Sequence, residues 1–403
     1  MSVIVVTFET TAEMLSKCLE SVISSELKAK EIVVVDNSTT SRVADFLGTW
    51  EAGRESKEPV LILARQPTNV GYAAATNRGI ALSAGDFVLL LNPDAVLRPA
   101  ALALMVEAAK CHPDAIGFAP KVTLASHELI IDSVGIGLHL GGQASQRGLG
   151  EPDIGQYATE ERIAGLCFAA ALVRRAAFSP EAVGLLDERY FMFYEDVDWS
   201  MRASILGETF WSVPGARVDH VHSASTRDLP AAFKSRLIQR NLVWTAAKNL
   251  ERHRVVTVVP ALLARQVISG LTHRRGWMSL RIAFDSVAGL PRLARSRREV
   301  QARRKLDDRS VLTEIDRTVT FDSERYLPVV SFASLVGVLS RLYAVAPTPA
   351  LRDLVLRLRL AGEASMTADG ARIASMVRES GVELEPGLEW SLRQLEGGDR
   401  GLG

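Results

Sequence analysis

Apolar residues in the first ninety positions fall into short runs separated by longer, mixed segments. Four of these runs have the length and β-branched character of buried strands: residues 2–7, 31–35, 60–63 and 86–91. Residues 11–27 instead show the helical spacing that gives one apolar face, carried by Met14, Leu15, Cys18, Leu19, Val22 and Ile23. Strand, helix and strand in this order predict right-handed βαβ units, and therefore an α/β fold with a mostly parallel sheet flanked by helices.

Two acidic residues stand directly after predicted strands. Asp36 follows the second run, and Asp94 follows the fourth. Ligands of parallel sheets bind at the carboxyl ends of the strands, so we expect a ligand that carries hydroxyls or phosphate, together with a divalent cation. Residues 7–11 contain no glycine, and no Gly-x-x-x-x-Gly-Lys loop occurs in the chain. These features argue against a dinucleotide-dependent dehydrogenase and against the common ATPases.

A third candidate is the segment 187–202, which places five acidic side chains among aromatic residues. Glu195, Asp196 and Asp198 lie within four residues, between an aromatic residue on either side. Like charges this close raise one another's pKa, which suits a general base, a cation site or both. The alternative is the acidic first turn of a solvated helix, which the helix dipole favours.

These motifs occur in an order that is typical of one family. They are residues 3–8, 34–38, 69–72, 77–79, 85–86, 91–94, 165–174, 191–198 and His220. Over roughly residues 1–250 the chain resembles the inverting family 2 glycosyltransferases with a GT-A fold, specifically the rhamnosyltransferase-like branch that builds bacterial surface polysaccharides. Two positions depart from the pattern. Glu9 stands where this branch usually has Asn, and Asn92-Pro93-Asp94 replaces Asp-x-Asp.

The resemblance implies a site for a nucleotide diphosphate sugar. Asp36 is expected to hydrogen-bond the nucleoside, and the donor pocket is expected to be shaped by Thr7, Glu9, Asn69, Gly71, Asn77 and Asn92. A hard cation, Mg²⁺ or Mn²⁺, would neutralise the leaving diphosphate, with Asp94 and His220 as its ligands. Each of these residues also has an ordinary interpretation. Asp94 and Asp36 could simply form turns, and His222 competes with His220.

The acidic segment supplies the expected acceptor side. Asp196 is predicted to be the base that takes the proton of the acceptor hydroxyl, with Asp198 as its rival for that role. Glu195 and Asp198 would orient the base. Tyr194 and Trp199 would contact the acceptor, Trp199 by offering an aromatic face to a sugar.

Composition bears on the compartment. Hydrophobic residues make up 47% of the chain, yet no apolar run reaches the length of about 20 residues that spans a bilayer. The sequence begins in a predicted strand without a charged leader, and its three cysteines suggest no disulfide framework. We therefore expect a cytoplasmic protein.

Charge is unevenly distributed although the net charge is zero. Residues 248–305 contain 14 Lys and Arg against three acidic residues, a net charge of +11, and they include apolar clusters. This pattern is typical of basic amphipathic helices on an anionic membrane, here at the inner face of the cell membrane. Packed helices with a solvated basic face are the alternative. Nucleic acid is disfavoured because the aromatic residues are few and cluster with aliphatic ones.

The sequence thus predicts three regions: a GT-A catalytic domain (1–245), a basic helical region (246–330) and a small helical C-terminal region (331–403). Short helices are expected at 331–345, 349–360 and 367–380, where packing or homodimerisation is the default expectation. The predicted activity moves a rhamnose-like sugar or another hexose from a dTDP-, UDP- or GDP-sugar to a glycan or lipid-linked acceptor. The alternatives are a catalytically inactive scaffold and a nucleotidyltransferase, which would require a glycine-rich triphosphate loop.

Overall fold

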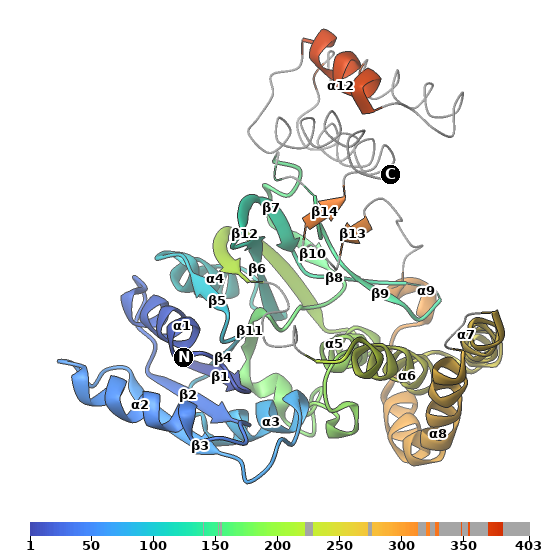
Figure 1. The fold of residues 1–403 in the computed structure, drawn as a ribbon, viewed down its shortest axis with the longest axis horizontal. Coiled ribbons are helices and arrows are strands. Elements are labelled where there is room, and N and C mark those ends of the chain that lie inside the picture. The colour runs from blue at the N-terminus through green and yellow to red at the C-terminus, as the bar shows by residue number, and fades with distance from the viewer. Residues whose placement is uncertain are drawn as a thin grey trace.

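The computed structural model describes residues 1–139, 141–151, 153, 155–221, 229–272, 276–312, 320–322, 327–329, 348, 354 and 370–381. The predicted strands form β1 (Ser2–Thr7), β2 (Glu31–Asp36), β3 (Val60–Arg65) and β4 (Phe87–Leu91). They lie in the order β3-β2-β1-β4, and every neighbouring pair is parallel. The predicted βαβ arrangement is confirmed (Figure 1).

The same sheet continues with later strands. β11 (Ala170–Arg174) runs antiparallel between β4 and β6 (Ala115–Leu124), and β12 (Thr209–His220) pairs in parallel with β6. Short antiparallel strands, β5 (Ala95–Leu97), β7 (His127–Ser133) and β10 (Glu161–Ile163), complete it. Six strands (β1, β2, β3, β4, β6 and β12) therefore share one direction, and the predicted mostly parallel sheet is confirmed. Separate hairpins are β8 (Ile136–Leu138) with β9 (Ala144–Gln146), and β13 (Thr320–Asp322) with β14 (Leu327–Val329).

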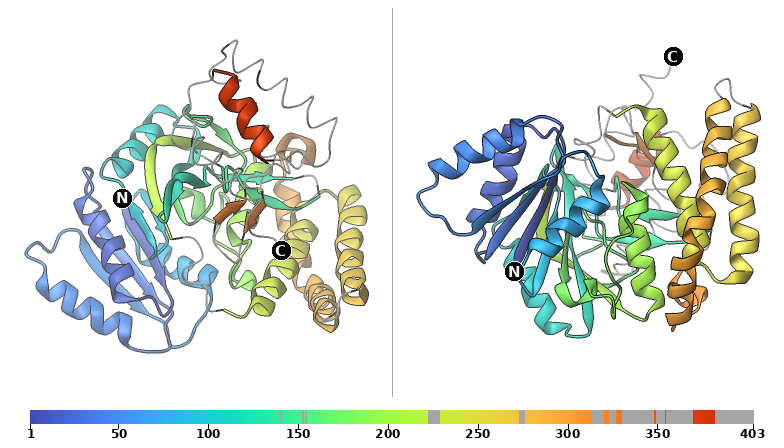
Figure 2. Two further views of the ribbon diagram at one scale, coloured as in Figure 1. Left: turned by 45° about the horizontal axis from the view of Figure 1, so that its top comes forward. Right: turned by 90° about the horizontal axis from the view of Figure 1, so that it is seen from below.

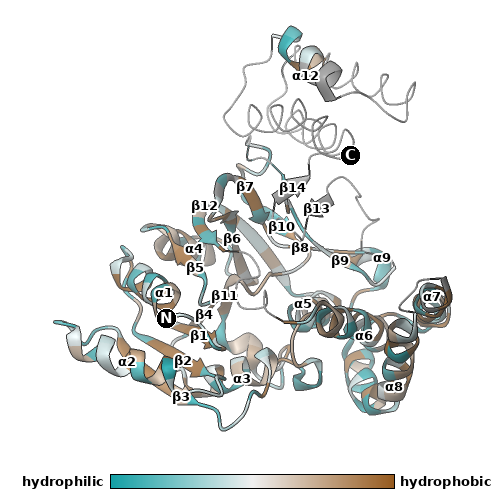
Figure 3. Cartoon of the chain, viewed as in Figure 1, coloured by the Kyte–Doolittle hydropathy of each residue, from teal (hydrophilic) through white to brown (hydrophobic). Residues whose placement is uncertain are grey.

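Helices cover both faces of the sheet because its strands are apolar on both sides. Along β1, Val3 and Val5 join the core beneath α1 (Ala12–Ser24), α2 (Arg42–Gly53) and α4 (Ala101–Cys111). Ile4 and Val6 point the other way, toward α3 (Tyr72–Leu82) and α5 (Glu195–Ile205). Figure 3 shows the resulting concentration of hydrophobic residues on the central strands.

A layer of long helices packs beside α5. It contains α6 (Ala231–Asn249), α7 (Arg252–Thr272) and α8 (Trp277–Arg303), followed by the short α9 (Asp308–Val311) (Figure 2). One apolar core joins α5, α6 and α7 to β8 and to the segment just before β11. The predicted boundary between residues 245 and 246 therefore falls inside α6.

The C-terminal region is described only in part. α12 (Gly370–Glu379) overlaps the predicted helix at 367–380, and the predicted helices at 331–345 and 349–360 lie outside the described residues. Within the part of the chain that the structure describes, no helix combines the length and apolarity needed to cross a membrane.

Candidate active site

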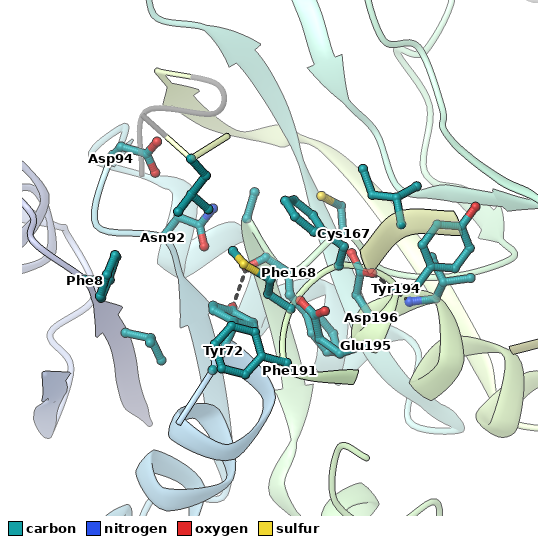
Figure 4. A pocket seen from close by; sticks show the side chains of 18 of the residues that line it. Phe8, Tyr72, Asn92, Asp94, Cys167, Phe168, Phe191, Tyr194, Glu195 and Asp196 are labelled. Carbon is teal, nitrogen blue, oxygen red and sulfur yellow. Dashed lines mark hydrogen bonds between the residues drawn. The ribbon is translucent and has the colours of Figure 1, made fainter. Parts of the chain in front are cut away.

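A cavity of about 550 Å³ lies where β1 and β4 end, between the sheet edge and the start of α5 and α6. Figure 4 shows Asn92 and Asp94 at one side of it and Glu195 and Asp196 at the other. The cavity is large enough for a sizeable ligand, and it brings together the two groups of polar residues that the sequence places more than 90 positions apart.

The donor side contains four of the residues expected there, namely Thr7, Asn69, Gly71 and Asn92. Gly71 has a φ of +85°, and a Cβ at this position would lie 2.5 Å from the backbone oxygen of Phe191. The glycine therefore allows the Phe191 segment to approach, and its role in the donor pocket stays a prediction. Asn37, which the sequence analysis did not assign, also lines the cavity and donates from Nδ2 to the Gly71 carbonyl at 3.1 Å.

Glu9 and Asn77 do not line this cavity. The exposed Glu9 carboxylate accepts hydrogen bonds from Thr39 and Thr40, and these bonds hold its pKa below the usual range. Buried Asn77 exchanges hydrogen bonds with the backbone of Leu186. Both residues hydrogen-bond neighbouring loops outside the cavity lining, and their role in the donor pocket stays a prediction.

Asp36 is fully buried beside the cavity and is not part of its lining. Its Oδ1 accepts from Thr7 Oγ1 at 3.1 Å and from the backbone N–H of Ser38 at 2.9 Å, as an Asx turn does. Its Oδ2 accepts no hydrogen bond within the described part of the chain and lies 3.9 Å from Arg65 Nε. The role of Asp36 as a nucleoside ligand stays a prediction.

Asp94 and His220 meet at the end of β12. Asp94 Oδ1 lies 3.2 Å from His220 Nε2, and His220 Nδ1 lies 2.6 Å from Oδ2 of the buried Asp132. Burial lowers the pKa of His220, but the two carboxylates outweigh it and raise this pKa to about 10. Asp132 carried no signal in the sequence analysis, because it lies 88 positions from His220.

This arrangement fits a divalent cation. Two adjacent ligands of an octahedral ion, each about 2.1 Å from it, lie about 3 Å apart, close to the Asp94–His220 separation. A carboxylate on the second ring nitrogen is the usual partner of a metal-binding histidine. No group of three or more Asp, Glu, His or Cys side chains suited to a metal ion occurs in the described ranges. A bound diphosphate would supply further oxygen ligands.

The segment before α5 has an unusual backbone. Phe191, Phe193 and Tyr194 all have φ between +66° and +70°, which is costly for residues other than glycine. Asn241, buried on α6, holds this segment by donating from Nδ2 to three carbonyls, those of Tyr190, Met192 and Phe193. Strain of this kind persists where the surroundings enforce it, so α6 shapes the cavity wall.

Glu195 and Asp196 begin α5 and both line the cavity. Burial raises the pKa of the Asp196 carboxyl to about 6, although this group accepts from the Val197 N–H at 2.7 Å. Burial and the charge of Asp196 raise the pKa of Glu195 well above its usual range. Glu195 Oε2 accepts no hydrogen bond from the described residues. Tyr194 lines the same wall.

Asp198 and Trp199 point away from the cavity. The fully buried Asp198 carboxylate accepts from Arg202 Nε at 3.0 Å, Lys248 Nζ at 2.8 Å and Asn249 Nδ2 at 2.8 Å. Trp199 is also fully buried and donates to the Gly184 carbonyl at 2.8 Å. Their assignment to the acceptor site is therefore corrected: both pack the interior behind α5.

Sequence comparisons relate this chain to a known protein family. Residues 2–179 match the profile of the family described as Glycosyl transferase family 2. Two proteins, from two strains of Mycobacterium tuberculosis, are each 30% identical to this chain, with 54% of this chain and 75% of the relative aligned. Both are described as N-acetylglucosaminyl-diphospho-decaprenol L-rhamnosyltransferase.

Structural comparison gives the fold. The crystal structure of GalNAc-T7 with UDP, GalNAc and Mn²⁺ superposes with a TM-score of 0.52 at 16% identity. The match covers 72% of this chain and 57% of that protein, so this chain spans little more than half of its length. The GT-A architecture expected from the sequence is confirmed.

Proposed function

Because this chain belongs to glycosyl transferase family 2, and is thus a glycosyltransferase, we propose that it moves a hexose from a nucleotide diphosphate sugar to a glycan or lipid-linked acceptor. The transferred sugar is preferably rhamnose-like, and the product belongs to a bacterial surface polysaccharide. One observation carries this proposal: a single cavity holds the Asp94–His220 pair at one side and Asp196 at the other.

The donor side would bind the diphosphate. Asp94 and His220 would hold Mg²⁺ or Mn²⁺, whose charge neutralises the leaving diphosphate. His220 donates from Nδ1 to Asp132, which leaves Nε2 directed at Asp94 and the cavity. Thr7, Asn37, Asn69 and Asn92 supply neutral polar groups along the same side.

The acceptor side would carry the base. Asp196 lines the cavity opposite Asp94, and its carboxylate would take the proton of the acceptor hydroxyl as that oxygen attacks the anomeric carbon. Attack from the face opposite the diphosphate inverts the anomeric centre. A pKa of about 6, raised by burial, leaves Asp196 ionised and still basic at neutral pH. Tyr194 and Glu195 lie beside it on the wall that the acceptor would contact.

The acceptor is proposed to be lipid-linked. Phe191, Met192, Phe233 and Ile238 give the cavity an apolar lining, which a free sugar would not need. The mycobacterial relatives are named for an acceptor that carries a decaprenol. This proposal includes a peripheral position at the cytoplasmic face of the cell membrane, supported by the net charge of +11 in residues 248–305.

Nucleotide and metal dependence can be tested together. The purified chain would be titrated calorimetrically with dTDP-, UDP- and GDP-sugars, with Mn²⁺ present and then with excess chelator. We expect one nucleotide class to bind with Mn²⁺ and to bind at least tenfold more weakly with chelator. Asp94→Asn should reproduce the effect of the chelator, whereas Asp114→Asn, an exposed control, should not. Equal binding with and without metal would contradict the cation role of both Asp94 and His220.

A further inference from the structure

The end of the α7–α8 hairpin exposes large apolar side chains. Leu271 is 74% exposed, Phe284 71%, Trp277 62% and Ile268 60%, and Leu280 and Val287 are also exposed. Single exposed apolar residues are common on proteins, but a cluster on two adjoining helix ends indicates a surface that binds something. This cluster, Ile268, Leu271, Trp277, Leu280, Phe284 and Val287, is called the hairpin patch below.

The sequence around the hairpin patch is basic. Residues 252–284 contain six arginines and no acidic residue. Two of these arginines, Arg265 and Arg281, are exposed within the patch's own helical turns. Some other cations of the basic stretch have structural roles. Arg297, for example, donates to backbone carbonyls at the end of α6, and Lys248 is buried against Asp198. The basic surface extends along α7 and α8, and Arg265 and Arg281 place part of it beside the apolar residues.

The hairpin patch lies at the same end of the helical layer as the cavity. Gln266 Nε2 of α7 donates to the Gln239 carbonyl of α6 at 3.2 Å, and Arg236 Nε of α6 donates to Asp285 Oδ2 of α8 at 2.6 Å. These bonds place the last turns of α7 and the first turns of α8 beside the first half of α6 (Figure 2). That half of α6 contributes Phe233 and the partly exposed Ile238 to the cavity lining.

We propose that the hairpin patch inserts into the surface of an anionic lipid bilayer and so holds the apolar rim of the cavity at that surface. A lipid-linked acceptor could then place its sugar beside Asp196 while its lipid stays in the bilayer. This inference rests on the proposed function for the acceptor, whereas the binding to lipid does not.

Charge decides between a bilayer and a second copy of this chain. A symmetric dimer through the hairpin patch would bring each arginine-rich segment against its own copy, and the acidic residue within the patch, Asp285, is already paired with Arg236. Anionic headgroups supply the opposite charge, and the interface below them accepts Trp, Phe and Leu side chains.

The test is flotation of the purified full chain with vesicles, without any substrate. We expect binding to vesicles of phosphatidylcholine with phosphatidylglycerol, and much weaker binding to phosphatidylcholine alone. The double variant Trp277→Ser, Phe284→Ser should lower the partition coefficient at least tenfold. Replacing Arg265 and Arg281 by Gln should lower it about fivefold for each arginine at low salt. The matched control Val60→Ser removes an apolar residue that is 54% exposed on the edge strand β3, and it should change nothing.

Two results would overturn the role of the hairpin patch in lipid binding. Unchanged vesicle binding by the Trp277, Phe284 double variant would mean that the hairpin patch does not contact lipid. A wild-type dimer in sedimentation that this double variant dissociates would show that the patch joins two copies.

A transfer assay separates this inference from the proposed function. The double variant should keep wild-type turnover on a detergent-soluble short-chain acceptor and lose it on a vesicle-embedded long-chain acceptor. Wild-type turnover on both acceptors would contradict the coupling between lipid binding and acceptor access.

Discussion

Asp198→Asn is the substitution that best tests whether Asp198, in the acidic segment, stabilises the fold or acts as the catalytic base. The Asp198 carboxylate accepts four hydrogen bonds, from Tyr190, Arg202, Lys248 and Asn249, with no exposed surface. An asparagine has the same shape but only one acceptor oxygen, and its NH₂ group would face donors that now meet a carboxylate oxygen. The substitution would also leave two buried cations without their shared counterion.

The expected loss of stability depends on the contacts that Lys248 and Arg202 keep in the Asp198→Asn variant. Removing one partner of a buried ion pair costs about 3–5 kcal/mol. Lys248 keeps Asp187 at 2.7 Å, and Arg202 keeps the carbonyls of Val183 and Leu185. We therefore expect the lower end, about 3 kcal/mol of unfolding free energy. Equilibrium unfolding in urea would measure it, with Asp114→Asn as the exposed control.

The same network predicts a pH dependence. Burial raises the pKa of Asp198, but the charges of Lys248 and Arg202 outweigh it and hold the pKa below its usual range. A lowered folded-state pKa contributes stability that is present above the unfolded pKa and lost as pH falls below about 4. The Asn variant should therefore lose less stability than wild type between neutral and acid pH. A variant as stable as wild type but without turnover would refute the structural role and make Asp198 the base.

Three further predictions concern the cavity. The value of kcat/KM should rise with pH around an apparent pKa near 6, because burial raises the pKa of the Asp196 base to about 6 and only its ionised form accepts a proton; an inflection near 4 would contradict this assignment. Gly71→Ala should cost about 1–3 kcal/mol of stability and weaken donor binding, because its Cβ would collide with the Phe191 backbone. Gly48→Ala, in α2 with nothing near its Cβ, should show neither effect in the same melting and titration experiments. Asn241→Asp removes the donor to three carbonyls and should lower both turnover and melting temperature, with turnover retained at wild-type level as the contrary result.

The fold was predictable because local sequence signals agree with it. The β-branched runs that predicted strands became β1 to β4 within a few residues of their expected ends. Asp94 and Asp196 could also be singled out from the sequence, since Asp94 follows a buried strand and Asp196 lies in a dense acidic segment. Both kinds of signal are local, so a single sequence contains them.

The rest depends on contacts between distant segments. Nothing near Asp132 or Asn241 in the sequence indicates that one meets His220 and the other holds the strained Phe191 segment. Asp198 and Trp199 share the acidic segment with Asp196, but helical geometry turns them toward the interior, where Lys248 from α6 supplies the counterion. The basic stretch likewise mixes structural arginines with exposed ones, and only the packing of α6 against α8 separates them.

Sugar transfer by Asp196→Asn tests most directly whether Asp196 is the base that activates the acceptor hydroxyl. The assay would use labelled donor with Mn²⁺ and a lipid-linked acceptor. Wild type should transfer the sugar with inversion, and the variant should be slower by about 10²–10⁴-fold. Donor affinity should be unchanged in calorimetry, because Asp196 lies opposite the Asp94–His220 pair. Wild-type turnover by Asp196→Asn, with the same donor affinity, would show that Asp196 is not the base.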